Sequence, residues 1–106
     1  MATANIYNFP EQQKGMTFNG IIFNLKINGV AANLIKVEAF FKGLNGKIYT
    51  MTNVGNASIT ITGVPGEFKI NDQIIDWDIG QYTYKIVTTL SNGFKKIYIK
   101  GSMKIS

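Results

Sequence analysis

A stretch of alternating apolar and polar side chains, residues 80–105, most constrains what this chain can fold into. Asn92-Gly93 interrupts the stretch, and this dipeptide between two alternating runs predicts a two-residue β-hairpin loop of type I′, because both central residues of that turn need positive φ. The loop would fix the register of the two strands. The predicted facing pairs are Tyr82 with Met103, Tyr84 with Gly101, Lys85 with Lys100, Ile86 with Ile99 and Thr88 with Ile97. One face then carries nearly all the apolar side chains, and Val87 and Tyr98 remain on the other.

The start of this hairpin carries a second signal. Asp78, Gly80 and Tyr82 follow the Asp-x-Gly-x-Tyr-x-Cys pattern that opens strand F of immunoglobulin-type sandwiches. There the Tyr hydroxyl bonds back to the backbone in a tyrosine corner. Tyr84 stands where that pattern has cysteine, so the resemblance implies the corner without the disulfide. An ordinary aromatic strand after a loop is the alternative interpretation.

The rest of the chain is divided into short alternating segments by turn signals. Asn28-Gly29, Asn45-Gly46, Asn53 to Ala57 and Gly63 to Gly66 are such signals, and no window between them has helical periodicity. A chain of 106 residues supports one core. We therefore predict a single-domain, immunoglobulin-like antiparallel β-sandwich of about seven to nine short strands.

The segment before the first clear strand is patterned differently. We assign residues 17–106 to the sandwich and residues 1–16 to an N-terminal arm. The arm either adds an edge strand or stays loose until a partner holds it.

The composition excludes several classes of function. Cysteine, histidine and arginine are all absent from the sequence, which removes a thiolate metal site, the commonest general base and the bidentate fork for phosphate. We therefore expect a protein that is not an enzyme and needs no cofactor. No apolar run approaches the roughly eighteen residues of a membrane span, and the N-terminus lacks a signal-peptide core. We expect no membrane partner and a chain that starts where the sequence starts.

The net charge of +5 comes from lysine alone. Lys85 and Lys100 are predicted to face each other on the outer side of the last hairpin, at a cost of about 0.2 to 1 kcal/mol. Such a pair either prevents edge-to-edge aggregation and keeps the protein soluble, or meets an acidic partner. We do not expect nucleic acid as a partner, because arginine is absent and the aromatic residues fit packing or protein interfaces.

Two candidate sites lie just before the last hairpin. Asp72, Asp76 and Asp78 hold three of the six carboxylates and are weak candidates for a calcium site, without the Gly and Glu spacing of a calcium loop. The alternative is that they bond backbone N–H groups in a turn. Trp77 between them would stack on a sugar ring if it is exposed, or cap the end of the core if it is packed.

Several short motifs occur along the chain in a fixed order. They are Tyr7-Asn8-Phe9-Pro10, Lys14-Gly15-Met16-Thr17-Phe18, Phe23-Asn24-Leu25-Lys26-Ile27-Asn28-Gly29, Leu34-Ile35-Lys36-Val37, Ser58-Ile59-Thr60-Ile61, Gly66-Glu67-Phe68-Lys69-Ile70, Gly80-Gln81-Tyr82-Thr83-Tyr84, Asn92-Gly93 and Gly101-Ser102-Met103-Lys104-Ile105. Over residues 5–106 this order resembles small immunoglobulin-like structural proteins encoded among tailed-bacteriophage virion genes. It is also similar to the N-terminal domain of phage upper baseplate proteins. Met16 departs from the pattern, because family members often carry Asp there.

The resemblance implies an assembly role without catalysis. The protein would be a piece of the tail, baseplate, neck or head decoration, made in the cytoplasm of the bacterial host and located in the virion. Its partners would be its own copies, as a homo-oligomer, and other virion proteins. The interface candidates are the arm residues Ile6, Tyr7 and Phe9 and the outward residues Phe40 and Tyr98. The alternative is a carbohydrate- or cell-surface-binding β-sandwich module, with a glycan as its partner.

Overall fold

The structure is a computed structural model that describes residues 5–27, 29–31, 33–54 and 58–106. Within these ranges the chain forms strands and turns and no helix. The strands are β1 (Asn5–Ile6), β2 (Met16–Phe18), β3 (Ile21–Asn24), β4 (Lys26–Ile27), β5 (Val30–Ala31), β6 (Leu34–Gly43), β7 (Ile48–Thr52), β8 (Ile59–Ile61), β9 (Glu67–Ile70), β10 (Gln73–Ile75), β11 (Gly80–Leu90) and β12 (Lys95–Ile105). The described part of the chain therefore has no helix that is long and apolar enough to cross a membrane.

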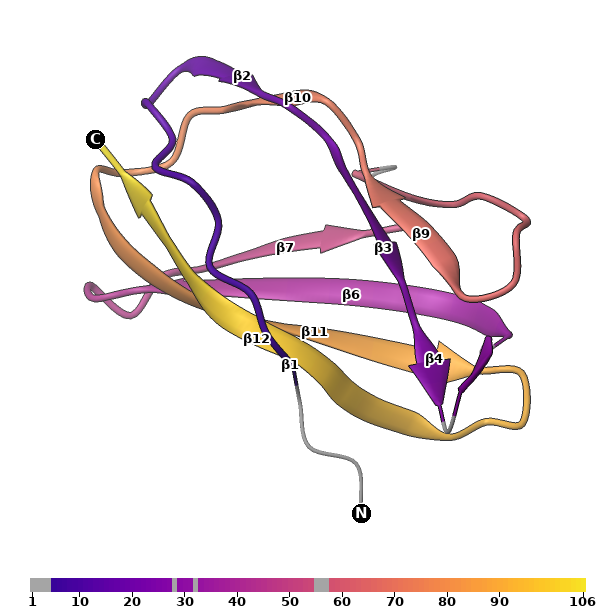
Figure 1. Ribbon diagram of the computed structural model, residues 1–106. Helices are drawn as coiled ribbons and strands as arrows, with labels where there is room; N and C mark the ends of the chain where they lie inside the picture. Colours follow the sequence, from indigo (N-terminus) through magenta and orange to yellow (C-terminus); the bar gives the residue numbers. More distant parts are fainter. Residues whose placement is uncertain (1–4, 28, 32, 55–57) are drawn as a thin grey trace.

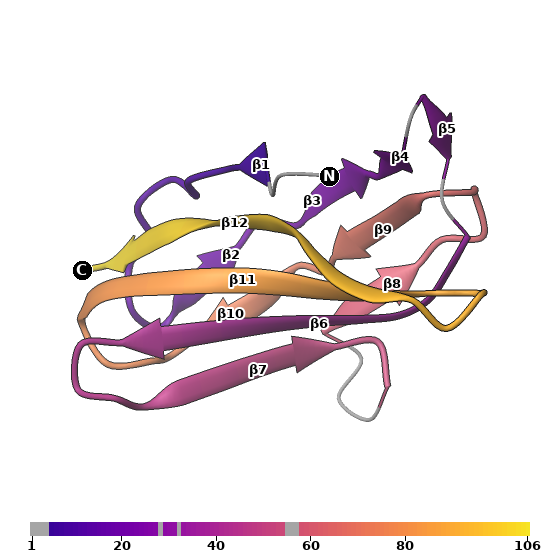
Figure 2. The same ribbon diagram turned by 90° about the horizontal axis from the view of Figure 1, so that it is seen from below.

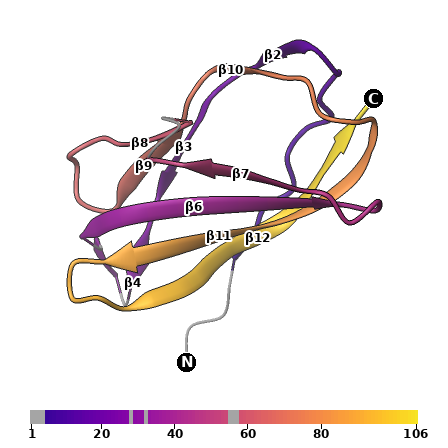
Figure 3. The same ribbon diagram turned by 180° about the vertical axis from the view of Figure 1, so that it is seen from behind.

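The strands form two facing layers (Figures 1 and 2). One layer is a five-stranded sheet of order β1-β12-β11-β6-β7, and the other contains β3-β9-β8 and the pair β2-β10. Figure 3 shows β6 running between β7 and β11 in the view from behind. The order β12-β11-β6-β7 matches the G-F-C-C′ order of a variable-type immunoglobulin sheet, and β3-β9-β8 matches B-E-D. The predicted immunoglobulin-like β-sandwich is confirmed. The described residues form twelve strands and not the predicted seven to nine, and three of these, β1, β4 and β5, have two residues each.

The second layer contains one long strand pair that is interrupted in the middle. Phe18 faces Gln73 and Ile21 faces Ile70, so the ladders on both sides of the interruption keep the same register. At the interruption the Gly20 amide donates a hydrogen bond of 2.5 Å to the carboxylate of Asp72. A Cβ at position 20 would lie 2.5 Å from the Ile70 carbonyl oxygen, so only glycine fits there.

The hairpin of β11 and β12 confirms part of the predicted register and corrects the rest. The pairs from Tyr82–Met103 to Ile86–Ile99 form as predicted, but Ile97 faces Val87 and not Thr88. The physical reason is the loop. Leu90 N–H bonds the Phe94 carbonyl and Gly93 has φ of 88°, which is typical of a three-residue loop ending in a glycine bulge.

A second bulge at Tyr98 restores the predicted register. Tyr98 is the extra residue of β12 between its partners Ile97 and Ile99. It turns inward and is 7% exposed, whereas Ile97 turns outward and is 42% exposed. The prediction that Tyr98 points outward is therefore wrong.

The core lies between the two layers and is built from alternate side chains of each strand. Its largest fully buried side chains are Tyr82, Phe41, Phe68, Met51, Ile59, Ile70, Ile75, Ile86, Met103, Ile105, Val37 and Thr88. The Tyr82 hydroxyl donates a hydrogen bond of 2.7 Å to the Asp78 carbonyl, so the tyrosine corner is confirmed. Tyr84 is buried at the position where the immunoglobulin pattern has cysteine. The core therefore uses aromatic packing in place of a disulfide.

Two of the predicted turns reach beyond the described residues. Asn28 of the Asn28-Gly29 turn lies outside them, although β4 and β5 on either side of it pair antiparallel. The turn from Asn53 to Ala57 also lies partly outside, from residue 55 onward.

Candidate functional site

The described part of the N-terminal arm, from residue 5, lies along the edge of the five-stranded sheet. β1 pairs in parallel with β12, and the following residues continue the ladder. The amide groups of the arm donate to β12 carbonyls in the order Tyr7 to Lys100, Phe9 to Ser102 and Gln12 to Lys104, at 2.8–2.9 Å. Of the two alternatives for the arm, the structure places it as an edge strand.

The aromatic residues of the arm face the interior. Phe9 is 8% exposed, and its ring centroid lies 4.8 Å from that of Tyr84 and 5.7 Å from that of Phe18. Tyr7 is half-buried, and its carbonyl accepts a hydrogen bond from the Tyr84 hydroxyl. Phe9 is therefore an anchor of the arm within its own chain, and its burial leaves little of its ring free for the predicted interface. Of the three interface candidates in the arm, Ile6 is the one that is mostly exposed, at 72%.

The backbone of the arm at Tyr7 contacts both Gly101 and the Tyr84 hydroxyl. A Cβ at Gly101 would lie 1.9 Å from the Tyr7 carbonyl oxygen, so the space above this glycine holds the backbone of the arm. Burial raises the pKa of the Tyr84 phenol above its ordinary value. The phenol is therefore held as a neutral hydrogen-bond donor to the arm.

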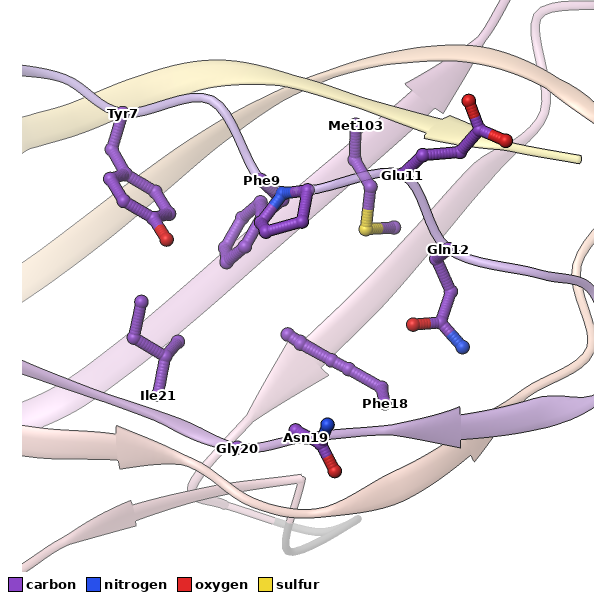
Figure 4. Close-up of a pocket in the computed structure, with 10 residues that line it drawn as sticks. Tyr7, Phe9, Glu11, Gln12, Phe18, Asn19, Gly20, Ile21 and Met103 are labelled. Atoms are coloured by element: carbon purple, nitrogen blue, oxygen red, sulfur yellow. The ribbon is translucent and has the colours of Figure 1, made fainter.

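A cleft of about 260 Å³ lies where the arm closes over the edge of the sandwich (Figure 4). Tyr7, Phe9 and Met103 point into it from one side, and Phe18 and Ile21 lie on the other. Two of its polar side chains, those of Glu11 and Gln12, make contacts that hold the arm. Glu11 forms an ion pair with Lys104 at 3.8 Å, and the side-chain amide of Gln12 donates to the backbone carbonyls of Gln13 and Met16. The cleft is thus part of the way the arm is attached.

The three aspartates have separate structural roles. Asp72 accepts from the Gly20 amide, Asp76 pairs with Lys14 at 3.3 Å, and the Asp78 carbonyl closes the tyrosine corner. Among the described residues no group of three or more His, Cys, Asp or Glu side chains is placed to hold a metal ion. The structure does not bring the weak calcium candidates together around one point.

Trp77 caps the end of the core. Its ring stacks on Tyr49, with centroids 4.6 Å apart and planes 11° apart. It also lies 5.0 Å from the Phe41 ring and 5.7 Å from the Tyr82 ring. Because Tyr49 already covers one face of the indole, this arrangement matches the packing alternative and leaves less surface for a sugar ring.

Close to Trp77, two pKa values shift because of the same ring cluster. Lys47 lies 5.1 Å from the Tyr49 ring centroid, and the contact with Tyr49 raises the pKa of the Lys47 ammonium. Burial raises the pKa of the Tyr82 phenol. Both shifts favour the protonated forms, which suits a structural cluster.

The outward side of the five-stranded sheet carries most of the remaining predicted residues. We call the outward side chains of β6, β7, β11 and β12 the lysine face. One row across the sheet runs Ile6, Lys100, Lys85, Phe40 and Thr50, and the next runs Ser102, Thr83, Lys42 and Ile48. Lys85 faces Lys100 as predicted. The register therefore brings Phe40 and three lysines from separate strands together.

The charges of the lysine face are unbalanced. Glu38 is the one acidic residue of β6, β7, β11 and β12, and its carboxylate is shared by Lys36 at 3.8 Å and Lys95 at 3.9 Å. Within the described chain, Lys42, Lys85 and Lys100 have no carboxylate within 4.0 Å. All three are exposed.

The lysine face is also hollowed. A shallow depression of about 350 Å³ is lined by Phe40, Lys42, Ile48, Thr83, Tyr84 and Lys85. Phe40 is half-buried and Ile48 is 57% exposed, so the depression combines apolar walls with ammonium groups. This combination can bind an apolar side chain that has carboxylate groups next to it.

Sequence reasoning found only part of this face. Phe40 and the pair of Lys85 and Lys100 were identified, whereas Ile48 was not. Alternation along 34–43 already places Phe40 and Lys42 on one side, but it does not show which strand lies next to β6.

A scan against models of known protein families finds no match, and a search of curated proteins finds no significant match.

Proposed function

We propose that this protein is a non-enzymatic building block of a tailed-bacteriophage particle, acting through protein–protein contacts in the tail, baseplate, neck or head decoration. The order of motifs along residues 5–106 supports the phage context. The lysine face is the observation that carries the contact function. A continuous sheet surface with exposed lysines around a half-buried Phe40 is suited to docking another protein.

The sandwich suits this role because its parts are held rigidly. The arm is fixed to β12 by a backbone ladder, and Phe9 is anchored in the core. Ile6 is thereby presented on the same side of the sheet as Lys100, at the sheet edge. A second contact, between copies of the chain through Ile6 and the neighbouring edge, is part of the proposal.

A carbohydrate- or cell-surface-binding module is the alternative function. Its main candidate, Trp77, is stacked on Tyr49 and packed against the core. Protein contacts therefore remain the preferred proposal.

The direct test is mass spectrometry of phage particles purified from the source of the gene. We expect the chain to stay at a constant ratio to the major structural protein through successive purification steps. A ratio that falls with each step, as for a host contaminant, would overturn the proposal.

Light scattering on the purified chain tests the contact between copies. We expect a mass above that of one chain, rising with concentration, and a lower mass for Ile6→Asp. A strictly monomeric protein at every concentration would contradict the homo-oligomeric form.

A further inference from the structure

We infer that the lysine face is a docking site for an acidic segment of another protein, with an apolar side chain of that segment seated beside Phe40. This inference rests on the proposed function, because it names the surface and the chemistry of one contact. The partner is a different protein, because the net charge of +5 on each copy opposes stacking copies on this face.

The first argument is the charge that remains uncompensated on the face. Lys85 and Lys100 face each other across β11 and β12, with Cβ atoms about 5 Å apart in such pairs. Glu38 is already shared by two other lysines, so it is not the partner of this pair. A carboxylate from outside would lie between the two ammonium groups and relieve their repulsion.

The second argument is the apolar depression next to this pair. Phe40 follows Lys85 in the same row, and Ile48 follows Lys42 in the next row. The depression of about 350 Å³ lies between these residues. Its apolar walls suit an apolar side chain of a partner, and the lysines around it suit carboxylates on either side of that side chain.

The composition of the face favours a protein over a nucleic acid. It carries lysine and no arginine, so it lacks the planar donor that binds phosphate in two-point contacts. Among the residues that line the depression, Phe40 is the one aromatic side chain in the outward row. Grooves that bind single-stranded nucleic acid stack successive bases on several aromatic rings. Nucleic acid and anionic lipid are therefore outcomes for the test to exclude.

The test uses the full chain and a synthetic peptide in which glutamates flank one leucine. Amide chemical shifts of the isotope-labelled protein are followed as the peptide is added. We expect the largest shifts at Phe40, Lys42, Thr83, Lys85 and Lys100. A matched peptide with glutamine in place of glutamate should shift these amides far less.

A matched pair of charge variants separates the site from general attraction. Lys42→Glu with Lys85→Glu changes the lysine face, whereas Lys26→Glu with Lys69→Glu makes the same change of net charge in β4 and β9, outside the lysine face. We expect the first variant to bind the peptide roughly tenfold to thirtyfold more weakly. Each exposed ion pair between a lysine and a peptide glutamate contributes up to about a factor of five in affinity, and two such pairs are lost. The second variant should lose no more than about twofold.

Three results would overturn the inference. They are equal weakening in both charge variants, shifts that map to the other layer, or stronger shifts with oligouridylate or with phosphatidylserine vesicles than with the acidic peptide. Phe40→Ala supplies a further readout, since it should weaken peptide binding without changing the net charge. If the chain is present in particles but Lys42→Glu with Lys85→Glu leaves it bound there, the inference fails and the proposed function stands. If the chain is absent from particles, the proposed function fails whatever the peptide does.

Discussion

Replacing Gly101 by alanine should release the N-terminal arm, because the new methyl group would occupy the position of the arm's backbone. Its Cβ would lie 1.9 Å from the carbonyl oxygen of Tyr7 and 2.7 Å from the carbonyl carbon. Backbone atoms cannot rotate away as a flexible side chain can, so the arm must shift by about 1 Å or more to reach ordinary contact distance.

The expected loss of stability follows from the contacts that this shift breaks. Tyr7 and Phe9 each donate a backbone hydrogen bond of 2.9 Å to β12, and each such bond contributes about 0.5 to 1.5 kcal/mol. The buried Tyr84 hydroxyl would also lose its acceptor, which costs about 1 to 3 kcal/mol. The freed arm regains backbone entropy. We therefore expect the free energy of unfolding to fall by about 2 to 4 kcal/mol.

Urea unfolding followed by the fluorescence of Trp77, the single tryptophan, measures this loss. The control is the same substitution in a chain that lacks residues 2–8. Without the Tyr7 carbonyl, Gly101→Ala should be neutral or stabilise by about 0.4 to 1 kcal/mol, because alanine restricts the unfolded chain more than glycine does. An equal loss in the full and the shortened chain would refute the role of the arm.

Three further predictions concern single contacts. Tyr82→Phe removes the hydroxyl of the tyrosine corner and should lower the free energy of unfolding by about 0.5 to 1.5 kcal/mol. A free energy of unfolding in urea equal to that of the parent would contradict this. Gly20→Ala places a Cβ 2.5 Å from the Ile70 carbonyl oxygen, so hydrogen exchange of the β3 and β9 amides should become faster, and unchanged exchange would show that the backbone adapts. Burial raises the pKa of Tyr84 in the folded state, so its contribution to stability is present below about pH 10 and is lost as the pH rises above that value. The free energy of unfolding of Tyr84→Phe should therefore fall less between about pH 9 and pH 11 than that of the parent. An equal fall in the two proteins would contradict the raised pKa of Tyr84.

The fold could be predicted from the sequence because its signals are local. Alternation along β11 and β12 fixed which side chains are buried, and the pattern around Tyr82 indicated the corner. The bulge at Tyr98 could not be predicted, because an Asn-Gly pair is compatible with both a two-residue and a three-residue loop. The choice of loop depends on how the two strands fit the core.

The candidate site was less predictable for a different reason. In the sequence, Phe9 belongs to an arm without clear alternation, and only its packing against Tyr84 and Phe18 shows that it is an anchor. That contact joins segments far apart in the sequence. Similarly, Phe40 lies next to Lys85 because β6 pairs with β11, and sheet topology of this kind has no signature in a single strand.

The three-residue loop before β12 and the bulge within β12 link the fold to the lysine face. The three-residue loop alone would move the register by one residue along the whole hairpin. Because β6 holds β11 in place, the β12 residues Ile99, Met103 and Ile105 would then turn out of the core. The bulge at Tyr98 compensates for the loop before these residues are reached, so the core pairs and the facing pair of Lys85 and Lys100 are both retained. Deleting Tyr98 should therefore do more than remove one buried side chain. It would carry the shifted register through the core, and we expect a loss of cooperative unfolding, whereas a deletion within the loop at Ser91 should be tolerated because the loop is exposed.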